Sequence, residues 1–149
     1  MRPNAPLKCP RVFSHSEQVL GAPLAVTLTG RRILIAEDEG LLALDMEFAL
    51  IDAGATVLGP VIDVQDGLEL LTANPDIDAA ILDLDLRGNP VYPIADALRE
   101  RGVPFVFHTG LGSTDDLHAR YGNETRIFTK PSHMESVIGA LVQMIPGPR

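Results

Sequence analysis

Residues 79–83 read Ala-Ala-Ile-Leu-Asp, a short apolar run that ends in a carboxylate. Three more largely apolar runs lead to polar residues: 33–36 to Glu37-Asp38-Glu39, 103–107 to Thr109-Gly110, and 127–129 to Lys130-Pro131. Runs without clean alternation are typical of strands buried on both faces of a parallel sheet. Because the carboxyl ends of parallel strands meet at one edge, where open α/β sheets bind ligands, we expect these polar residues to lie together.

The predicted edge combines several carboxylates with one hydroxyl and one ammonium. Carboxylates that lie close together disfavour each other's ionisation, so a cluster is costly unless a hard divalent cation such as Mg²⁺ offsets the charge. An isolated Asp38 or Asp83 after a strand is most simply a helix cap or a loop carboxylate, so only the ordered set carries weight. Lys130 strengthens this interpretation, because the chain has only one other lysine, Lys8. The set predicts a Mg²⁺ site.

From Arg31 onward, strand-like and helix-like segments alternate, which is the pattern of βα units around a parallel sheet. The predicted strands lie near residues 32–36, 55–58, 79–83, 103–107 and 125–128. The predicted helices cover residues 41–53, 64–73, 92–100, 113–121 and 132–145. Gly54 can cap the end of the first helix and Asp63 the start of the second. We therefore predict an α/β fold with a doubly wound, five-stranded parallel sheet.

Length and composition narrow the class of protein. A chain of 149 residues with 46% hydrophobic content can build one domain with a real core. The net charge of −8, without a basic stripe, argues against a nucleic-acid partner. The single cysteine, Cys9, excludes a disulfide framework and a thiolate metal site, and it fits a reducing, cytoplasmic location. No apolar run is long enough to span a membrane.

Residues 1–29 differ from the rest and are predicted to form a flexible extension, which leaves residues 30–149 as the folded domain. The segment has no sustained period, and prolines are scattered through it. A signal peptide is the alternative, because basic residues precede the apolar stretch 19–28. Glu17 before that stretch, Gly21 and Pro23 within it, and the lack of a small-residue cleavage site favour an extension whose apolar part lies against the domain.

Residues 31 to about 146 resemble the receiver domain of bacterial two-component response regulators. The resemblance is carried, in this order, by Ile-Leu-Ile-Ala-Glu-Asp-Glu at 33–39, Ile-Leu-Asp-Leu-Asp-Leu at 81–86, Thr109-Gly110 and Lys130-Pro131. It implies a flavodoxin-like (βα)5 fold with strand order 2-1-3-4-5. Residues 107–112 are similar to the Phe-Ala-Thr-Gly-hydrophobic-Tyr motif of the single-domain FATGUY regulators, with His108 and Gly112 departing from it.

The resemblance assigns the chemistry to specific residues. It implies that Asp83 is the phosphoacceptor, which attacks a phosphohistidine of a sensor histidine kinase or histidine phosphotransfer protein. It also implies that Mg²⁺ is held by Asp83 itself, by Asp38 directly, by Glu37 through water and by the backbone carbonyl of Asp85. A carboxylate nucleophile and a cation that neutralises phosphoryl charge are what this transfer needs.

The remaining implied roles concern the phosphoryl group and its signal. Thr109 and Lys130 are expected to bind phosphoryl oxygens, and the Lys130–Pro131 peptide is expected to be cis. The protein is expected to accept phosphate and lose it by self-dephosphorylation without being a turnover enzyme. Its signal is expected to pass through contacts with a downstream reader protein, with no role for membrane or nucleic acid.

Two other functions fit parts of the pattern. Asp83-Leu84-Asp85 also resembles the Asp-X-Asp signature of haloacid-dehalogenase-like phosphotransferases, which use an aspartyl phosphate and Mg²⁺. In that superfamily the nucleophile lies on the first motif strand and an acidic pair follows the lysine, whereas here the acidic pair precedes both. The second alternative is an interaction module that is never phosphorylated, but such a module has no need for all five receiver positions.

Two positions near the expected site, His108 and Ile127, depart from the patterns of the proteins that the chain resembles. His108 is interpreted as a buried histidine with satisfied hydrogen bonds, and a pH-responsive neighbour of the phosphate is the alternative. Ile127 stands where many receivers carry an aromatic residue that reports phosphorylation, and Phe128 should point to the opposite face of the strand. The loop 111–116 is therefore the expected moving element.

Overall fold

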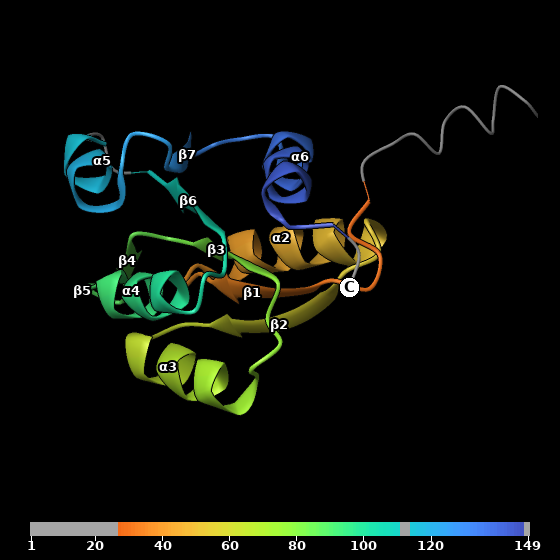
Figure 1. Ribbon diagram of the computed structural model, residues 1–149, viewed down its shortest axis with the longest axis horizontal. Coiled ribbons are helices and arrows are strands. Elements are labelled where there is room, and N and C mark those ends of the chain that lie inside the picture. The colour runs from red at the N-terminus through yellow and green to blue at the C-terminus, as the bar shows by residue number, and fades with distance from the viewer. Residues whose placement is uncertain (1–26, 111–113, 148–149) are drawn as a thin grey trace, which may run out of the picture.

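The computed structural model describes residues 27–110 and 114–147, which build a parallel sheet covered by helices on both faces (Figure 1). The sheet has five strands in the order β2-β1-β3-β6-β7, and all neighbours in it are parallel. These strands are β1 (Arg32–Ala36), β2 (Thr56–Val61), β3 (Ala79–Leu82), β6 (Phe105–Thr109) and β7 (Arg126–Thr129). Counted along the chain as five main strands, their order is 2-1-3-4-5, so the predicted fold class is confirmed.

Five helices connect the strands. They are α2 (Gly40–Asp52), α3 (Val64–Ala73), α4 (Tyr92–Glu100), α5 (Asp115–Tyr121) and α6 (Met134–Met144). Asp63 caps α3 as predicted, since its carboxylate accepts a hydrogen bond from the backbone N–H of Asp66 at 2.8 Å. Helices α5 and α6 begin two residues later than the patterns predicted.

The core lies in two layers, one on each face of the sheet. In β1, Ile33 and Ile35 face one layer, which α2 and α6 cover, while Leu34 and Ala36 face the other, which α3, α4 and α5 cover. Successive side chains of a strand point to opposite faces, so both sets are buried here. The two-sided burial explains why the strand sequences lack polar alternation.

Strand β2 continues further than its sequence indicates. The predicted strand covers residues 55–58, yet the observed strand continues through Gly59-Pro60 to Val61. It lies at the edge of the sheet, where a proline removes no donor that a neighbour needs. The pairing with β1 shifts between Leu34 and Ala36, and the Gly59–Pro60 peptide is cis.

A small hairpin after β3 was not predicted. Strands β4 (Asp85–Leu86) and β5 (Asn89–Pro90) pair antiparallel around the two-residue turn Arg87-Gly88. Both turn residues have positive φ, 54° for Arg87 and 88° for Gly88, which is the backbone of a type I′ turn. Such turns usually begin with Asn, Asp or Gly, so arginine in the first position hid the hairpin in the sequence.

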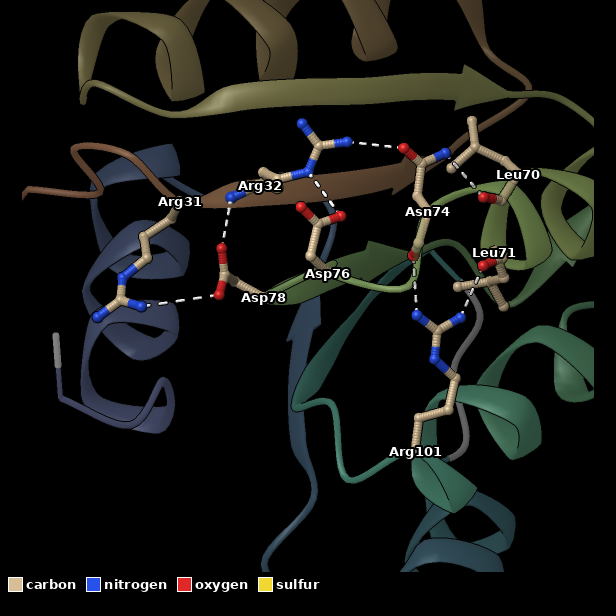
Figure 2. A network of polar contacts seen from close by, with 8 residues as sticks. All are labelled: Arg31, Arg32, Leu70, Leu71, Asn74, Asp76, Asp78 and Arg101. Atoms are coloured by element: carbon tan, nitrogen blue, oxygen red, sulfur yellow. Dashed lines mark hydrogen bonds and ion pairs between the residues drawn. The ribbon is translucent and has the colours of Figure 1, made fainter. Parts of the chain in front are cut away.

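The end of the sheet opposite the carboxyl edge is tied together by a polar network (Figure 2). Asp78 accepts a hydrogen bond from the backbone N–H of Arg32 at 2.8 Å and lies 3.6 Å from the guanidinium of Arg31. Arg32 also contacts Asp76 and Asn74. Arg101, at the end of α4, donates to the backbone carbonyl oxygens of Leu71 and Asn74, both at 2.8 Å. The network anchors the α3–β3 connection.

The packed domain reaches back to Leu28, which is 1% exposed and belongs to the layer under α2. Its backbone N–H donates to the carbonyl of Ala53 at 2.7 Å. Residues 1–26 of the predicted extension lie outside the described residues. Among the helices of residues 27–110 and 114–147, none is long and apolar enough to cross a membrane.

Candidate functional site

Four strands of the sheet deliver polar side chains to its carboxyl edge. The register pairs Ala36 with Leu82, and Leu82 with Phe107, so Glu37, Asp83 and His108 follow on adjacent strands. The backbone N–H of Asp83 still donates to the carbonyl of Ala36 at 2.8 Å, which continues the ladder past β3. Thr109 ends β6 and Lys130 follows β7. The edge therefore assembles the residues that the apolar runs predicted.

Glu37, Asp38 and Asp83 form an acidic cluster. Each offers one carboxylate oxygen, and these oxygens all lie within 4.8 Å of one another. Glu37 is 1% exposed and Asp83 9% exposed, so little solvent screens their charges. The donor set consists only of oxygen atoms, which is the chemistry that Mg²⁺ prefers. The cluster fits a hard divalent cation.

Lys130 places its ammonium between two of these carboxylates. Its Nζ lies 3.0 Å from Oδ2 of Asp83 and 2.9 Å from Oε2 of Glu37. Burial tends to lower the pKa of Lys130, but the hydrogen bonds with Glu37 and Asp83 outweigh it and raise the pKa above its ordinary value. The ammonium offsets only part of the negative charge in the cluster.

The pKa of Glu37 reflects its burial and the negative charge that Lys130 leaves uncompensated. Burial raises the pKa of Glu37 from 4.5 to about 7, and the charge of Asp83 adds to the rise, while the hydrogen bond with Lys130 opposes it. Its Oε1 also accepts a hydrogen bond from the backbone N–H of Glu39 at 3.1 Å. The carboxyl group is thus held in place yet ionised only in part near neutral pH.

The unexpected hairpin supplies a contact that sequence reasoning missed. The backbone N–H of Arg87 donates to Oδ2 of Asp38 at 2.8 Å, across 49 positions of sequence. The carboxylate of Asp85 accepts a hydrogen bond from the N–H of Gly88 at 3.1 Å inside the same turn. The Asp85 side chain is therefore engaged outside the acidic cluster, and its backbone carbonyl stays a predicted metal ligand.

Thr109 and Gly110 lie beside the lysine. Thr109 is 1% exposed, and its backbone carbonyl accepts a hydrogen bond from the N–H of Lys130 at 2.9 Å, which joins the ends of β6 and β7. A Cβ placed on Gly110 would lie 3.9 Å from Cδ of Lys130, so the lysine stem passes close to the glycine. The Lys130–Pro131 peptide is cis, as the family resemblance implied. Residues 111–113 of the expected moving loop lie outside the described residues.

His108 differs from its sequence interpretation. It is 1% exposed, but neither ring nitrogen has a hydrogen-bond partner within the described part of the chain, so the expectation of a satisfied histidine is wrong. Burial lowers the pKa of His108, the charge of Lys130 lowers it further, and the charge of Asp83 opposes the shift. By strand alternation its ring shares the sheet face of Val106, next to Asp83.

No family model matches the chain. The structure is similar to SdrG from Sphingomonas melonis Fr1, with 40% sequence identity, a TM-score of 0.66 and coverage of 76% of this chain and 95% of that one. It is also similar to a response regulator receiver protein from Sinorhizobium medicae WSM419, with 30% identity, a TM-score of 0.69 and coverage of 79% and 96%.

A curated relative, the transcriptional regulatory protein PdtaR of Mycobacterium tuberculosis, is 28% identical over 113 residues. The chain spans about half the length of the curated relatives that it matches, 55% of each, while the match covers 74% of this chain. The FATGUY motif includes residues 111 and 112, which lie outside the described residues, so that subgroup stays a prediction. Both the sheet order and the receiver relative of 30% identity lead to one assignment. The chain belongs to the response regulator receiver proteins.

Proposed function

We propose that the protein accepts a phosphoryl group on Asp83 and signals through protein contacts. The observation that carries this proposal is the position of the Asp83 carboxylate, 3.0 Å from the Lys130 ammonium and within 4.8 Å of the carboxylates of Glu37 and Asp38. A nucleophile, a cationic donor and a set of oxygen atoms suited to a metal therefore lie together at the carboxyl edge of the sheet. Phosphoryl transfer needs this combination, because positioning and charge stabilisation provide most of its catalysis.

The proposed reaction is a transfer from nitrogen to oxygen. One carboxylate oxygen of Asp83 forms a bond to phosphorus while the P–N bond of a phosphohistidine breaks, and the electron pair of that bond returns to the imidazole nitrogen. Lys130, freed from its contact with Asp83, binds an equatorial phosphoryl oxygen, and the hydroxyl of Thr109 binds another. Asp83, Asp38, Glu37 and the backbone carbonyl of Asp85 would hold Mg²⁺, which would neutralise the phosphoryl charge.

The proposed partners are a sensor histidine kinase or histidine phosphotransfer protein as the donor and a reader protein as the receiver of the signal, in the cytoplasm. The order of the motifs, with the acidic pair Glu37-Asp38 ahead of both Asp83 and Lys130, supports an acceptor rather than a haloacid-dehalogenase-like turnover enzyme, with the acyl phosphate lost by slow hydrolysis. Steady-state assays with small phosphate esters should therefore show no turnover. Sustained turnover would favour the haloacid-dehalogenase-like alternative, and the absence of labelling would favour an unphosphorylated interaction module.

The test is incubation with Mg²⁺ and a small acyl phosphate donor, followed by localisation of the added phosphate by mass spectrometry. Wild type should gain one phosphate on Asp83, and Asp83→Asn should gain none, because an amide is not a nucleophile for this step. Asp85→Asn is the matched control, since it neutralises a neighbouring carboxylate but keeps the backbone carbonyl, so it should still be labelled. Labelling of Asp83→Asn at another position would contradict the proposal.

A further inference from the structure

Arg87 is the one arginine among residues 27–110 and 114–147 whose guanidinium forms no hydrogen bond or ion pair within that part of the chain. Arg87 is exposed, and the hydrogen bond that anchors it comes from its backbone N–H. The other guanidinium groups there bind carboxylates, carbonyl oxygens or side-chain amides: they belong to Arg31, Arg32, Arg99, Arg101, Arg120 and Arg126. Because a guanidinium is a strong donor that matches oxyanions, the group at Arg87 is open to such a ligand.

The β4–β5 hairpin fixes the backbone of Arg87 beside the acidic cluster. Its N–H donates to Oδ2 of Asp38 at 2.8 Å, and Asp38 offers a carboxylate oxygen within 4.8 Å of one from Asp83. The hairpin joins the end of β3 to the start of α4 (Figure 1), and the N–H of Val91 donates to the carbonyl of Leu84 at 2.8 Å across its base. The backbone of the turn is therefore held in place, while the Arg87 side chain can still reorient.

The turn itself gives no reason for an arginine at this position. Arg87 has a φ of 54°, in the first position of a type I′ turn, where Asn, Asp and Gly are preferred. Asparagine there would suit the turn better and would still supply the N–H that Asp38 accepts, because that donor belongs to the backbone. The long cationic side chain therefore has no structural role among the described residues.

Positive charge is scarce at the carboxyl edge of the sheet. In the described connections that follow the five main strands, Lys130 and Arg87 are the only lysine or arginine residues. Lys130 is already engaged by Asp83 and Glu37, at 3.0 and 2.9 Å. A phosphoryl group brings about two further negative charges at neutral pH, so a second side-chain cation at this edge favours its binding.

We propose that the guanidinium of Arg87 binds oxygen atoms of the phosphoryl group on Asp83. The inference rests on the proposed function, since it adds a residue that contacts the same phosphoryl group. Only the carboxylate of Asp38 separates the backbone N–H of Arg87 from the Asp83 carboxylate, and the long side chain carries a planar fork that matches two phosphate oxygens. The contact strengthens binding of the anion, whereas Mg²⁺ binding depends on the oxygen ligands and gains nothing from a nearby cation.

Binding of the trifluoroberyllate anion in saturating Mg²⁺ tests the contact, because this small anion mimics a phosphoryl group on a carboxylate. Calorimetric titration of the full chain gives its dissociation constant for wild type and for Arg87→Asn, which suits the turn. The variant should bind about tenfold more weakly, because it loses a charge-assisted hydrogen bond. Arg87→Lys keeps the charge without the fork and should lie between them. Equal affinity in wild type and Arg87→Asn overturns the proposal.

Arg126→Gln is the matched control for net charge. Arg126 is exposed at the start of β7, at the opposite edge of the sheet, so this variant removes the same charge and should bind the anion as wild type does. An equal loss of affinity in Arg126→Gln and Arg87→Asn would mean a general effect of charge and overturns the proposal.

Two further measurements separate anion binding from a role in shaping the turn. Arg87→Asn should be at least as stable as wild type in urea melts and should bind Mg²⁺ at least as tightly, because it relieves the turn and removes a positive charge. Lower stability with weaker Mg²⁺ binding would mean that Arg87 shapes the hairpin, and it overturns the proposal. If wild type itself neither binds the anion nor is labelled on Asp83, the proposed function fails and this inference fails with it. Labelled wild type with full affinity in Arg87→Asn refutes this inference alone.

Discussion

Glu37 is the residue whose charge the fold changes most. Its pKa of about 7 lies above the ordinary value of 4.5, so the stability associated with its folded site is fully present below pH 4.5 and is lost as pH rises through about 7. In metal-free buffer at pH 8, Glu37→Gln should be more stable than wild type by about 1–3 kcal/mol, because it keeps the shape without the buried charge.

Urea melts of Glu37→Gln and wild type at pH 5 and pH 8 measure this difference. The advantage of the variant should nearly vanish at pH 5, where the wild-type carboxyl group is protonated. An equal advantage at both pH values would mean that the gain does not come from the charge of Glu37.

His108 has the opposite pH dependence. Its folded pKa is lowered, so its contribution to stability is present above the ordinary value of 6.5 and is lost as pH falls and the unfolded state takes up the proton. His108→Leu replaces a buried polar ring, which has no hydrogen-bond partner among the described residues, with an apolar side chain of similar size. It should therefore raise the free energy of unfolding by about 1–3 kcal/mol at pH 7.

The gain from His108→Leu should grow between pH 7 and pH 5, which denaturant melts at both values can show. A variant that is less stable than wild type at pH 7 would indicate that the imidazole has a hydrogen-bond partner, such as an ordered water, that holds it in place.

At the scale of elements, the short helix α5 is held by side chains rather than by its own length. The hydroxyl of Tyr121 donates to Asp96 on α4 at 2.8 Å, and Arg120 donates to the same carboxylate at 3.1 Å. The guanidinium of Arg120 also lies 4.2 Å from the ring centre of Tyr92. Burial raises the pKa of Tyr121 to about 12, and the hydrogen bond with Asp96 adds to the rise.

Tyr121→Phe should destabilise α5, because it removes the hydrogen bond from the Tyr121 hydroxyl to Asp96 while the ring packing is kept. We expect a loss of about 1 kcal/mol in stability and faster hydrogen exchange in residues 115–121 than in α4. Since the folded pKa of Tyr121 is raised, this stabilisation should hold below pH 10 and fade as pH approaches 12. Tyr92→Phe is the control, because it also removes a tyrosine hydroxyl. Equal hydrogen-exchange rates in residues 115–121 of both variants would mean that the effect does not come from the Tyr121–Asp96 hydrogen bond.

The β4–β5 hairpin shows why local patterns did not reveal every element. Arg87 takes a positive φ that few arginines adopt, and the contact of its N–H with Asp38 compensates for it. Strand β2, which contains Pro60, is a similar case, because only its place at the sheet edge makes the proline tolerable. Both features depend on neighbours distant in sequence.

At the scale of the whole molecule, the acidic cluster makes stability depend on the cation. A ligand bound only by the folded state stabilises it by mass action, by about 2.7 kcal/mol at a hundred times its dissociation constant. Mg²⁺ should raise the melting temperature of wild type, and Asp38→Ala should lose the response. Asp45→Ala, which removes an exposed carboxylate on α2, is the control that keeps it. A full response in Asp38→Ala would place the metal elsewhere.

By itself, the sequence determined the order of the five main strands and the five helices, and which of the polar residues that follow the strands reach the carboxyl edge. Asp83 and Lys130 each follow a short apolar run that has the length and composition of a strand. Because βα units arrange their strands in parallel, the residues that follow the strands meet at one edge of the sheet. The tertiary structure alone decided the pKa of Glu37, the burial of His108 without a hydrogen-bond partner among residues 27–110 and 114–147, and the bridging position of the Lys130 ammonium. Those properties depend on burial and on distances between strands, which arise only when residues remote in sequence pack against one another.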